Sequence, residues 1–250
     1  MKICIVLGTR PEITKLSPII RECERKNIEF FVIHTGQHYS KNMDAVFFEE
    51  LKLASPKYNL EVGSCSPGKQ IALMVEKIEG ILLQEKPDVV LVQGDTNSVL
   101  AGALAAKKAN IKVGHVEAGL RSYDEEMPEE HNRIIVDHIS DFLFAPTEDA
   151  AKKIDCEGID KKKVFVVGNT AVDAIFQNIS IAKESVDVLT KFSLQKNEYG
   201  VVTAHRPANV DKFNDLKKLL DGLNKVTKEL QIPLIFAVHP RTKKKLEEHN

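Results

Sequence analysis

Residues 88–121 read DVVLVQGDTNSVLAGALAAKKANIKVGHVEAGLR, and this stretch decides the fold class. It begins with a short β-branched run over 88–93, continues with an alanine-rich segment of helical period over 96–109, and ends with a second apolar run over 111–116. Unbroken apolar runs of this length are typical of strands buried on both faces. Two such strands joined through a helix pair in parallel, so the stretch predicts one β–α–β unit of an α/β protein.

The same alternation extends in both directions from this unit. Further apolar runs predict strands, and segments of helical period between them predict helices. The pattern predicts a mostly parallel, doubly wound sheet with helices on both faces, which binds ligands outside the carboxyl ends of its strands. The further strands are Lys2–Leu7, Glu29–His34, Asp141–Ala145 and Lys163–Val167, and the further helices are 12–27, 42–53, 68–86, 128–140 and 147–157.

The composition is typical of a soluble globular protein, with 43% hydrophobic and 28% charged residues among 250. A net charge of -1 argues against a general nucleic-acid binder or membrane-surface binder. The cysteines (Cys4, Cys23, Cys65 and Cys156) form no C-x-x-C pair, which favours reduced thiols over disulfides or a zinc site. No apolar stretch reaches the roughly 18 residues that span a bilayer, and Ile3–Leu7 is too short for a signal-peptide core. We therefore expect a cytoplasmic protein.

We expect two Rossmann-like domains of unequal length. Residues 1–168 contain six predicted strands, enough for one complete doubly wound domain. Residues 169–198 are helical and then lysine-rich, and we interpret them as a connecting helix and linker. Residues 199–250 contain only two predicted strands, Gly200–Ala204 and Ile232–Val238, too few to complete a sheet covered on both faces. This part is interpreted as the beginning of a second domain, truncated in this chain.

The segment after the first strand has the features of an anion site. Gly8–Glu12 turns tightly into a helix, and a helix N-terminus offers free N–H groups and a positive dipole end. Arg10 and Lys15 add two cations, which suits a phosphate, although the segment matches neither the dinucleotide fingerprint nor the P-loop. The alternative is that Arg10 simply pairs with Glu12 or another surface acid.

Gln37 and His38 follow the second strand. His34 and His38 have the spacing of metal ligands, but a strand-to-loop boundary does not place positions four apart on one face. A polar loop lining the ligand cleft is the preferred interpretation over a metal site.

Three acids follow the next strand ends: Asp95, Glu117 and Glu129. Asp95 or Thr96 could instead cap a helix, and the dipole favours Glu129 in a first helical turn. Glu117 comes directly after a buried strand and is therefore expected in the crevice, whereas His115 within that strand is more simply a satisfied core histidine. Three acids at one sheet edge, facing the cations of the first loop, indicate a reactive site rather than three unrelated caps.

In the second domain, His205 and Arg206 follow one strand, and His239 and Arg241 follow the next. Basic pairs at the carboxyl ends of neighbouring strands predict anion binding. Two exposed basic loops are the alternative.

Together these strand-end segments resemble the non-hydrolysing UDP-N-acetylglucosamine 2-epimerases. The matching segments lie in family order over almost the whole chain, and the run from Gly114 to Arg121 is the most specific. The resemblance implies two Rossmann-like domains of GT-B type. The matching segments are Gly8–Glu12 with Lys15, Gln37-His38, Gly94–Thr96, His115–Arg121, Pro128–Glu130 with Asn132-Arg133, Gly168–Thr170 with Asp173, Thr203–Arg206 and His239-Pro240.

The resemblance also implies a reaction, the interconversion of UDP-GlcNAc and UDP-ManNAc by inversion at C2 of the sugar, with no cofactor. Family members eliminate UDP to give 2-acetamidoglucal and then add UDP back. The cations serve the departing diphosphate, and the acids serve C1 and C2 as proton acceptor, proton donor and cation stabiliser in an order that stays open. The implied catalytic residues are Asp95, Glu117, Glu129 and His205, and the implied substrate contacts are Arg10, Lys15, Asp95, Glu117, His205, Arg206 and His239.

The resemblance further implies a homodimer and, as in bacterial relatives, a possible allosteric UDP-GlcNAc site beside Gln37 and His38. The sequence departs from the family at Ala208, where an acid is usual, and at Asn250, beyond which family members continue with segments that grip the nucleotide. Three alternatives stay open: a hydrolysing 2-epimerase, a related UDP-sugar glycosyltransferase, and a fragment that lacks turnover because it lacks that grip.

Overall fold

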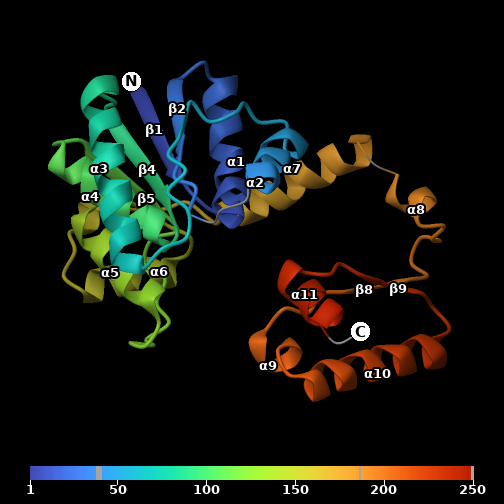
Figure 1. The fold of residues 1–250 in the computed structure, drawn as a ribbon. Coiled ribbons are helices and arrows are strands. Elements are labelled where there is room, and N and C mark those ends of the chain that lie inside the picture. Colours follow the sequence, from blue (N-terminus) through green and yellow to red (C-terminus); the bar gives the residue numbers. More distant parts are fainter. Residues whose placement is uncertain (38–40, 186, 249–250) are drawn as a thin grey trace. The chain divides into compact units, whose positions relative to one another are not determined.

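The computed structural model describes residues 1–37, 41–185 and 187–248 (Figure 1). The chain divides into two compact units, Met1–Ala182 and Lys183–Asn250. Each unit has a parallel sheet of its own.

The first unit is built on a seven-stranded sheet with the order β3-β2-β1-β4-β5-β6-β7 and parallel pairing throughout. The strand order reverses between β1 and β4, which marks the switch point where doubly wound folds bind ligands. Six strands match the predicted runs to within one residue, and the two-residue β3 was not predicted. The strands are β1 (Lys2–Leu7), β2 (Glu29–His34), β3 (Tyr58–Asn59), β4 (Val89–Gln93), β5 (Lys112–Val116), β6 (Phe142–Ala145) and β7 (Val164–Val166).

Both faces of this sheet are covered, which explains the unbroken apolar runs of its strands. Cys4 and Val6 of β1 pack with α3, α4 and α5, whereas Ile5 and Leu7 pack with α1 and α2. Figure 1 shows the same arrangement, with the sheet between these two sets of helices. The helices of this unit are α1 (Arg10–Arg25), α2 (Lys41–Glu50), α3 (Pro67–Glu85), α4 (Asn97–Lys108), α5 (Pro128–Ile139), α6 (Glu148–Cys156) and α7 (Thr170–Ser185), the last extending into the second unit.

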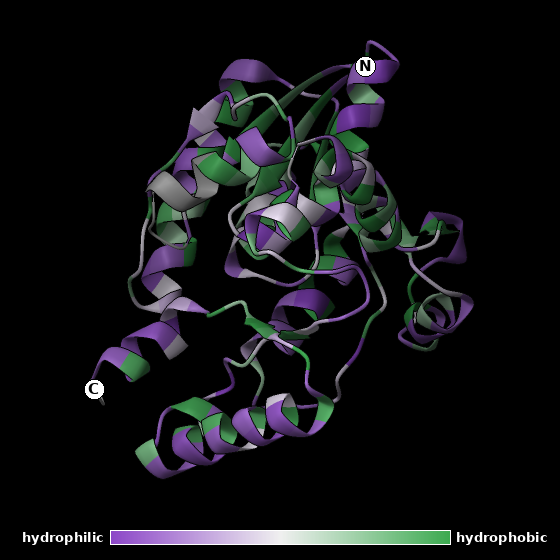
Figure 2. Ribbon diagram, turned by 90° about the vertical axis from the view of Figure 1, so that its right-hand side faces the viewer, coloured by the Kyte–Doolittle hydropathy of each residue, from purple (hydrophilic) through white to green (hydrophobic). Residues whose placement is uncertain are grey.

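The second unit contains one parallel strand pair, β8 (Gly200–Val202) and β9 (Leu234–Phe236). Few of its side chains are fully buried; Val210, Leu216 and Thr242 are the ones in the described part. The long helix α10, at the bottom of Figure 2, alternates hydrophilic and hydrophobic colour along its length, as an amphipathic helix does. The helices of this unit are α8 (Val188–Lys191), α9 (Pro207–Val210), α10 (Phe213–Leu230) and α11 (Pro240–Glu248).

Several general features bear on the class of protein. In the described part of the chain, no helix combines the length and the apolar character needed to cross a bilayer. The four cysteines are free: Cys4 and Cys23 are buried, and Cys65 and Cys156 are exposed. Over the same residues, no three His, Cys, Asp or Glu side chains are grouped so as to hold a metal ion.

Candidate active site

The turn after β1 can only be made with glycine at position 8. A Cβ on Gly8 would lie 2.0 Å from Thr35 Oγ1 and 2.2 Å from Ser98 Oγ, which are themselves hydrogen-bonded at 2.7 Å. The backbone of the β1 turn therefore lies directly against the ends of β2 and α4. This close approach fixes the start of α1, the helix that carries Arg10 and Lys15, at the switch point.

Glu12 in the first turn of α1 is a buried carboxyl group, 2% exposed. It accepts hydrogen bonds from Gly8 N at 3.0 Å, Thr9 Oγ1 at 2.7 Å and Thr96 Oγ1 at 2.9 Å. Burial raises the pKa of Glu12 to about 7, and these hydrogen bonds oppose the rise. Glu12 thus joins the turn after β1 to the turn after β4. The suggested Arg10–Glu12 pair is wrong; the Arg10 guanidinium carbon lies 5.8 Å from the centre of the Phe47 ring instead.

The turn after β4 presents Asp95 without using it as a helix cap. Thr96 is the N-cap of α4, and its side chain accepts from Val99 N. The Asp95 carboxylate forms an ion pair with Arg133 of α5, and its backbone carbonyl accepts from Asn132 Nδ2 at 2.8 Å. The Asp95 side chain remains 32% exposed, so the held carboxylate still faces solvent at the edge of the sheet.

Glu117 occupies the turn after β5 in a strained conformation, with φ at 71°. A non-glycine residue in the left-handed region costs about 1–3 kcal/mol and is often found at functional sites. The Glu117 carboxylate forms an ion pair with Lys15 Nζ at 2.7 Å and accepts a short hydrogen bond from Gln93 Nε2 of β4. An acid from one loop and a cation from α1 therefore meet, as the sequence predicted for this edge.

The two glutamates that open α5 have different environments. Glu129 is half-buried in the first turn of α5. Glu130 is 3% exposed and accepts from Ser122 N at 2.9 Å and from Tyr123 N at 3.0 Å. Burial raises the pKa of Glu130, but these hydrogen bonds and the charge of Arg133 lower it by more, so the pKa lies below that of an ordinary glutamate. Glu130 orders the loop before α5, which leaves Glu129 as the α5 acid still available to a ligand.

His115 on β5 is a satisfied core histidine, as predicted. It is completely buried, with Nδ1 at 2.6 Å from Asp137 Oδ1 and Nε2 at 2.8 Å from Gly94 O. Asp137 of α5 also pairs with Arg121 NH1 at 2.8 Å. This network lies directly beneath the turns that carry Asp95 and Glu117.

Gln37 follows β2 and contacts the start of α4. Its Oε1 accepts from Ser98 N at 3.0 Å and from Ser98 Oγ at 2.7 Å. Its backbone carbonyl accepts from Gln70 Nε2 at 3.1 Å. His38 lies outside the described residues. In this structure Gln37 therefore supports the N-terminus of α4.

In the second unit, the two histidines predicted after neighbouring strands do come together. His205 and His239 stack with ring centroids 5.2 Å apart. Thr242 Oγ1 donates to Ala204 O at 2.6 Å, which holds α11 against the end of β8. Arg206 is the exposed N-cap residue of α9, directly after His205.

Comparison with known proteins identifies the family of the chain. The model of the UDP-N-acetylglucosamine 2-epimerase family matches residues 21–250. The chain belongs to the UDP-N-acetylglucosamine 2-epimerase family. A UDP-N-acetylglucosamine 2-epimerase of Methanococcus maripaludis is 57% identical over 99% of this chain and 68% of its own.

Solved structures agree with this assignment. The epimerase of Methanocaldococcus jannaschii, crystallised with UDP-GlcNAc and UDP, superposes with a TM-score of 0.84 at 55% identity, over 99% of this chain and 68% of that one. The fold is also similar to that of WaaB, a lipopolysaccharide outer core galactosyltransferase, with a TM-score of 0.51 at 15% identity over 100% of this chain and 71% of that one. The chain is thus an epimerase-family member with the predicted Rossmann-like, GT-B-type fold.

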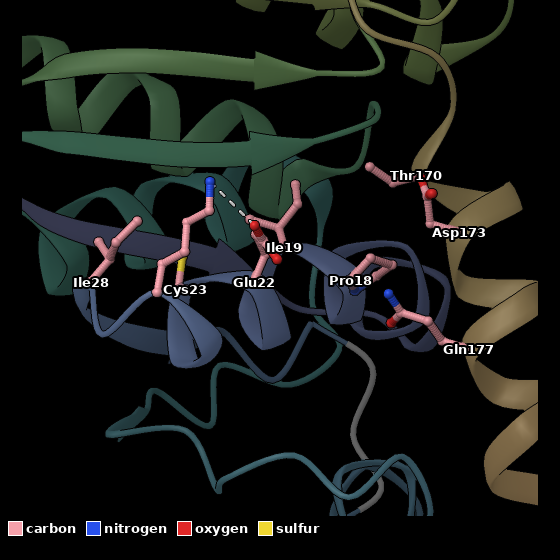
Figure 3. A pocket seen from close by; sticks show the side chains of 9 residues that line it. Pro18, Ile19, Glu22, Cys23, Ile28, Thr170, Asp173 and Gln177 are labelled. Carbon is pink, nitrogen blue, oxygen red and sulfur yellow. Dashed lines mark ion pairs between the residues drawn. The ribbon is translucent and has the colours of Figure 1, made fainter.

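The epimerase chain also has a surface hollow of about 400 Å³ between α1 and α7 (Figure 3). Its α7 side is formed by Thr170, Asp173 and Gln177. On its α1 side, Glu22 and Lys26 form an ion pair at 3.3 Å. None of its lining residues belongs to the group of charged residues at the strand ends.

Sequence reasoning missed some residues that hold these strand-end turns together. The sequence analysis gave no role to Gln93, the last residue of a predicted strand, to Arg133, or to Asp137. A polar side chain ending an apolar strand, as Gln93 does, was the one available signal. The partners of Arg133 and Asp137 depend on how α5 packs, which no local pattern encodes.

Proposed function

We propose that this chain interconverts UDP-GlcNAc and UDP-ManNAc by inversion at C2 of the sugar. Family membership supports this proposal, and so does the related epimerase that was crystallised with UDP-GlcNAc and UDP. The observation that carries it is the pairing of Lys15 with Glu117 beside the Asp95–Arg133 pair, at the switch point of the sheet. Acids and cations from separate loops gathered at one edge suit a charged substrate that exchanges a proton.

The chemistry explains why both kinds of group are needed. The C2 hydrogen is not next to a carbonyl, so it becomes acidic only as the C1–O bond to the diphosphate breaks and the ring gains oxocarbenium character. Cations stabilise the departing UDP, and a carboxylate takes the C2 proton to give 2-acetamidoglucal. Protonation of C2 on the other face and return of UDP to C1 complete the epimerisation. Carbon is neither oxidised nor reduced overall, so the reaction requires no redox cofactor.

The first unit supplies residues for both needs. We assign Arg10 and Lys15 to the diphosphate, because both lie in the first turns of α1, where the helix dipole adds to their charge. We assign Asp95, Glu117 and Glu129 to C1 and C2 as proton acceptor, proton donor and cation stabiliser. Each well-placed acid or base contributes about 10²–10⁴ in rate.

We propose that the second unit contributes to the same reaction by holding the diphosphate. His205 follows β8, His239 follows β9, and Arg206 adds a guanidinium beside them. In this proposal residues 1–168 form the domain of the catalytic acids, 169–198 connect, and 199–250 begin the nucleotide-binding domain.

We further propose a homodimer that works in the cytoplasm, where free cysteines such as Cys65 and Cys156 stay reduced. The family resemblance supports the dimer, and sedimentation of the chain would test it. We also propose that Gln37 and His38 border a second, activating UDP-GlcNAc site. Strictly hyperbolic kinetics in UDP-GlcNAc would contradict that activation.

Incubation with UDP-GlcNAc in deuterated water tests the main proposal. The expected result is UDP-ManNAc together with deuterium at C2 of both recovered UDP-sugars, measured by proton NMR and mass spectrometry. Free ManNAc as the main product would indicate a hydrolysing enzyme instead. Recovery of unlabelled UDP-GlcNAc alone would refute the proposal for this chain, and calorimetry with UDP would then show whether nucleotide binding persists.

A further inference from the structure

His115 lies between the two turns that carry Asp95 and Glu117, and both of its ring nitrogens face oxygen atoms. Nδ1 is 2.6 Å from Asp137 Oδ1, and Nε2 is 2.8 Å from Gly94 O. Its side chain is 1% exposed, so water is not an alternative partner for either nitrogen.

Both oxygens are acceptors, which decides where the protons are. Gly94 O is a carbonyl oxygen and can only accept. The Asp137 carboxylate already accepts from Arg121 NH1 at 2.8 Å and from Gly119 N at 3.1 Å, so it is ionised and also only accepts. Burial raises the pKa of Asp137, but the hydrogen bond and charge of His115 and the charge of Arg121 lower it by more. A neutral imidazole has one N–H and would leave a lone pair facing one of these oxygens.

The charges around His115 balance when it carries both protons. Asp137 of α5 faces it directly, Arg121 from the loop after β5 faces Asp137, and Glu157 after α6 faces Arg121 at 2.6 Å. His138 of α5 lies farther out, 3.9 Å from Glu157. Two positive groups, His115 and Arg121, then alternate with two negative ones, which avoids an unpaired buried charge.

The hydrogen bonds of this network end on the backbone of both reactive turns. Gly94 precedes Asp95, and Gly119 comes two residues after Glu117. Gly94, Glu117 and Gly119 all have positive φ, at 82°, 71° and 81°. His115 bonds the first turn through Gly94 O, and Asp137 bonds the second through Gly119 N. The pair thus joins the turn at Gly94 to the strained turn at Glu117.

We propose that His115 is a positioning residue that is protonated on both ring nitrogens and, through Asp137, sets the spacing of the Asp95 and Glu117 turns. This role rests on the proposed epimerase reaction, because it matters only if both acids act on one sugar. His115 itself contacts no substrate and transfers no proton. Its loss should therefore slow the chemical step rather than weaken substrate binding.

Nitrogen NMR of the full chain labelled with ¹⁵N-histidine tests the protonation state without reference to activity. At about pH 8, where an exposed histidine is neutral, both nitrogens of His115 should carry a proton and have the shifts of an imidazolium. The resonances are assigned by their loss in His115→Gln. A His115 nitrogen that carries a lone pair would overturn the proposal.

Kinetics tests the positioning role. In His115→Gln we expect kcat for deuterium exchange at C2 to fall about 10- to 100-fold, the cost of a small misplacement of reacting groups, with KM for UDP-GlcNAc within about threefold. His138→Gln, on α5 directly after Asp137, is the matched control and should keep the wild-type kcat. An unchanged kcat in a folded His115→Gln, or a loss confined to KM, would overturn the role. Absence of exchange in the wild type would refute the proposed function and leave the NMR result to decide the protonation state.

Discussion

Replacing Glu12 by glutamine should remove a loss of stability that the protein undergoes as the pH rises. Burial raises the pKa of this carboxyl group from 4.5 to about 7. Below its unfolded pKa, an acid with a raised pKa in the folded state does not change the free energy of unfolding, because it is protonated in both states. As the pH rises through 4.5, the unfolded state loses this proton first and the free energy of unfolding falls, and the fall is complete above about pH 7. A shift of this size corresponds to about 3 kcal/mol, at about 1.4 kcal/mol per pKa unit.

Urea unfolding followed by far-ultraviolet circular dichroism measures this effect, since the chain has no tryptophan to report by fluorescence. Between about pH 4 and pH 8, Glu12→Gln should gain about 3 kcal/mol relative to the wild type. Glu76→Gln, at an exposed position of α3, is the control and should follow the wild-type profile. A constant difference between wild type and Glu12→Gln across this range would refute the argument, because Glu12 would then keep one charge state throughout.

Two further tests use substitutions whose surroundings differ in a known way. Gly119→Ala would place a Cβ 2.4 Å from the carbonyl oxygen of Ala150 at φ 81°, so we expect its free energy of unfolding in urea to fall by about 3 kcal/mol. Gly158→Ala has a similar φ of 79° but meets open space, and its free energy of unfolding should fall by about 1 kcal/mol. Equal losses in the two variants would contradict the steric argument. Asp95→Asn and Glu117→Gln should each lower turnover of UDP-GlcNAc by about 10²–10⁴ while UDP still binds in calorimetry, and near-normal turnover in both would remove these acids from the mechanism.

The fold was largely readable from the sequence because its central strands are buried on both faces. Residues 3–7 of β1 and 89–92 of β4 are all apolar, and an unbroken run of this kind leaves little room for another interpretation. β3 was missed because Tyr58–Asn59 is too short to show any period and exists only through its pairing with β2. A strand set by pairing rather than by its own residues is not encoded locally.

For the strand-end turns, the sequence predicted which turns share one edge of the sheet but not how their side chains pair. Lys15 and Glu117 were predicted at one edge, and they form an ion pair although 102 residues separate them. Glu12 was considered as a surface partner for Arg10, and it is instead buried beneath the first turn. Whether an acid in a first helical turn faces solvent or the core depends on the packing of the neighbouring loop, here Thr96, and periodicity carries no information on that.

The turn that contains Glu117 is still hydrogen-bonded to the neighbouring strands of the sheet. Both Glu117 N and Ala118 N still donate to Phe144 O of β6, at 3.1 and 3.2 Å, and Gly94 N donates to Val116 O. This segment should therefore not tolerate the insertions and deletions that surface loops usually accept. An added residue between Val116 and Gly119 would have to break strand pairing or push α6 away. We therefore expect natural variation in loop length at the other strand ends of this sheet edge. Attempts to alter substrate preference by lengthening a loop should use those positions as well.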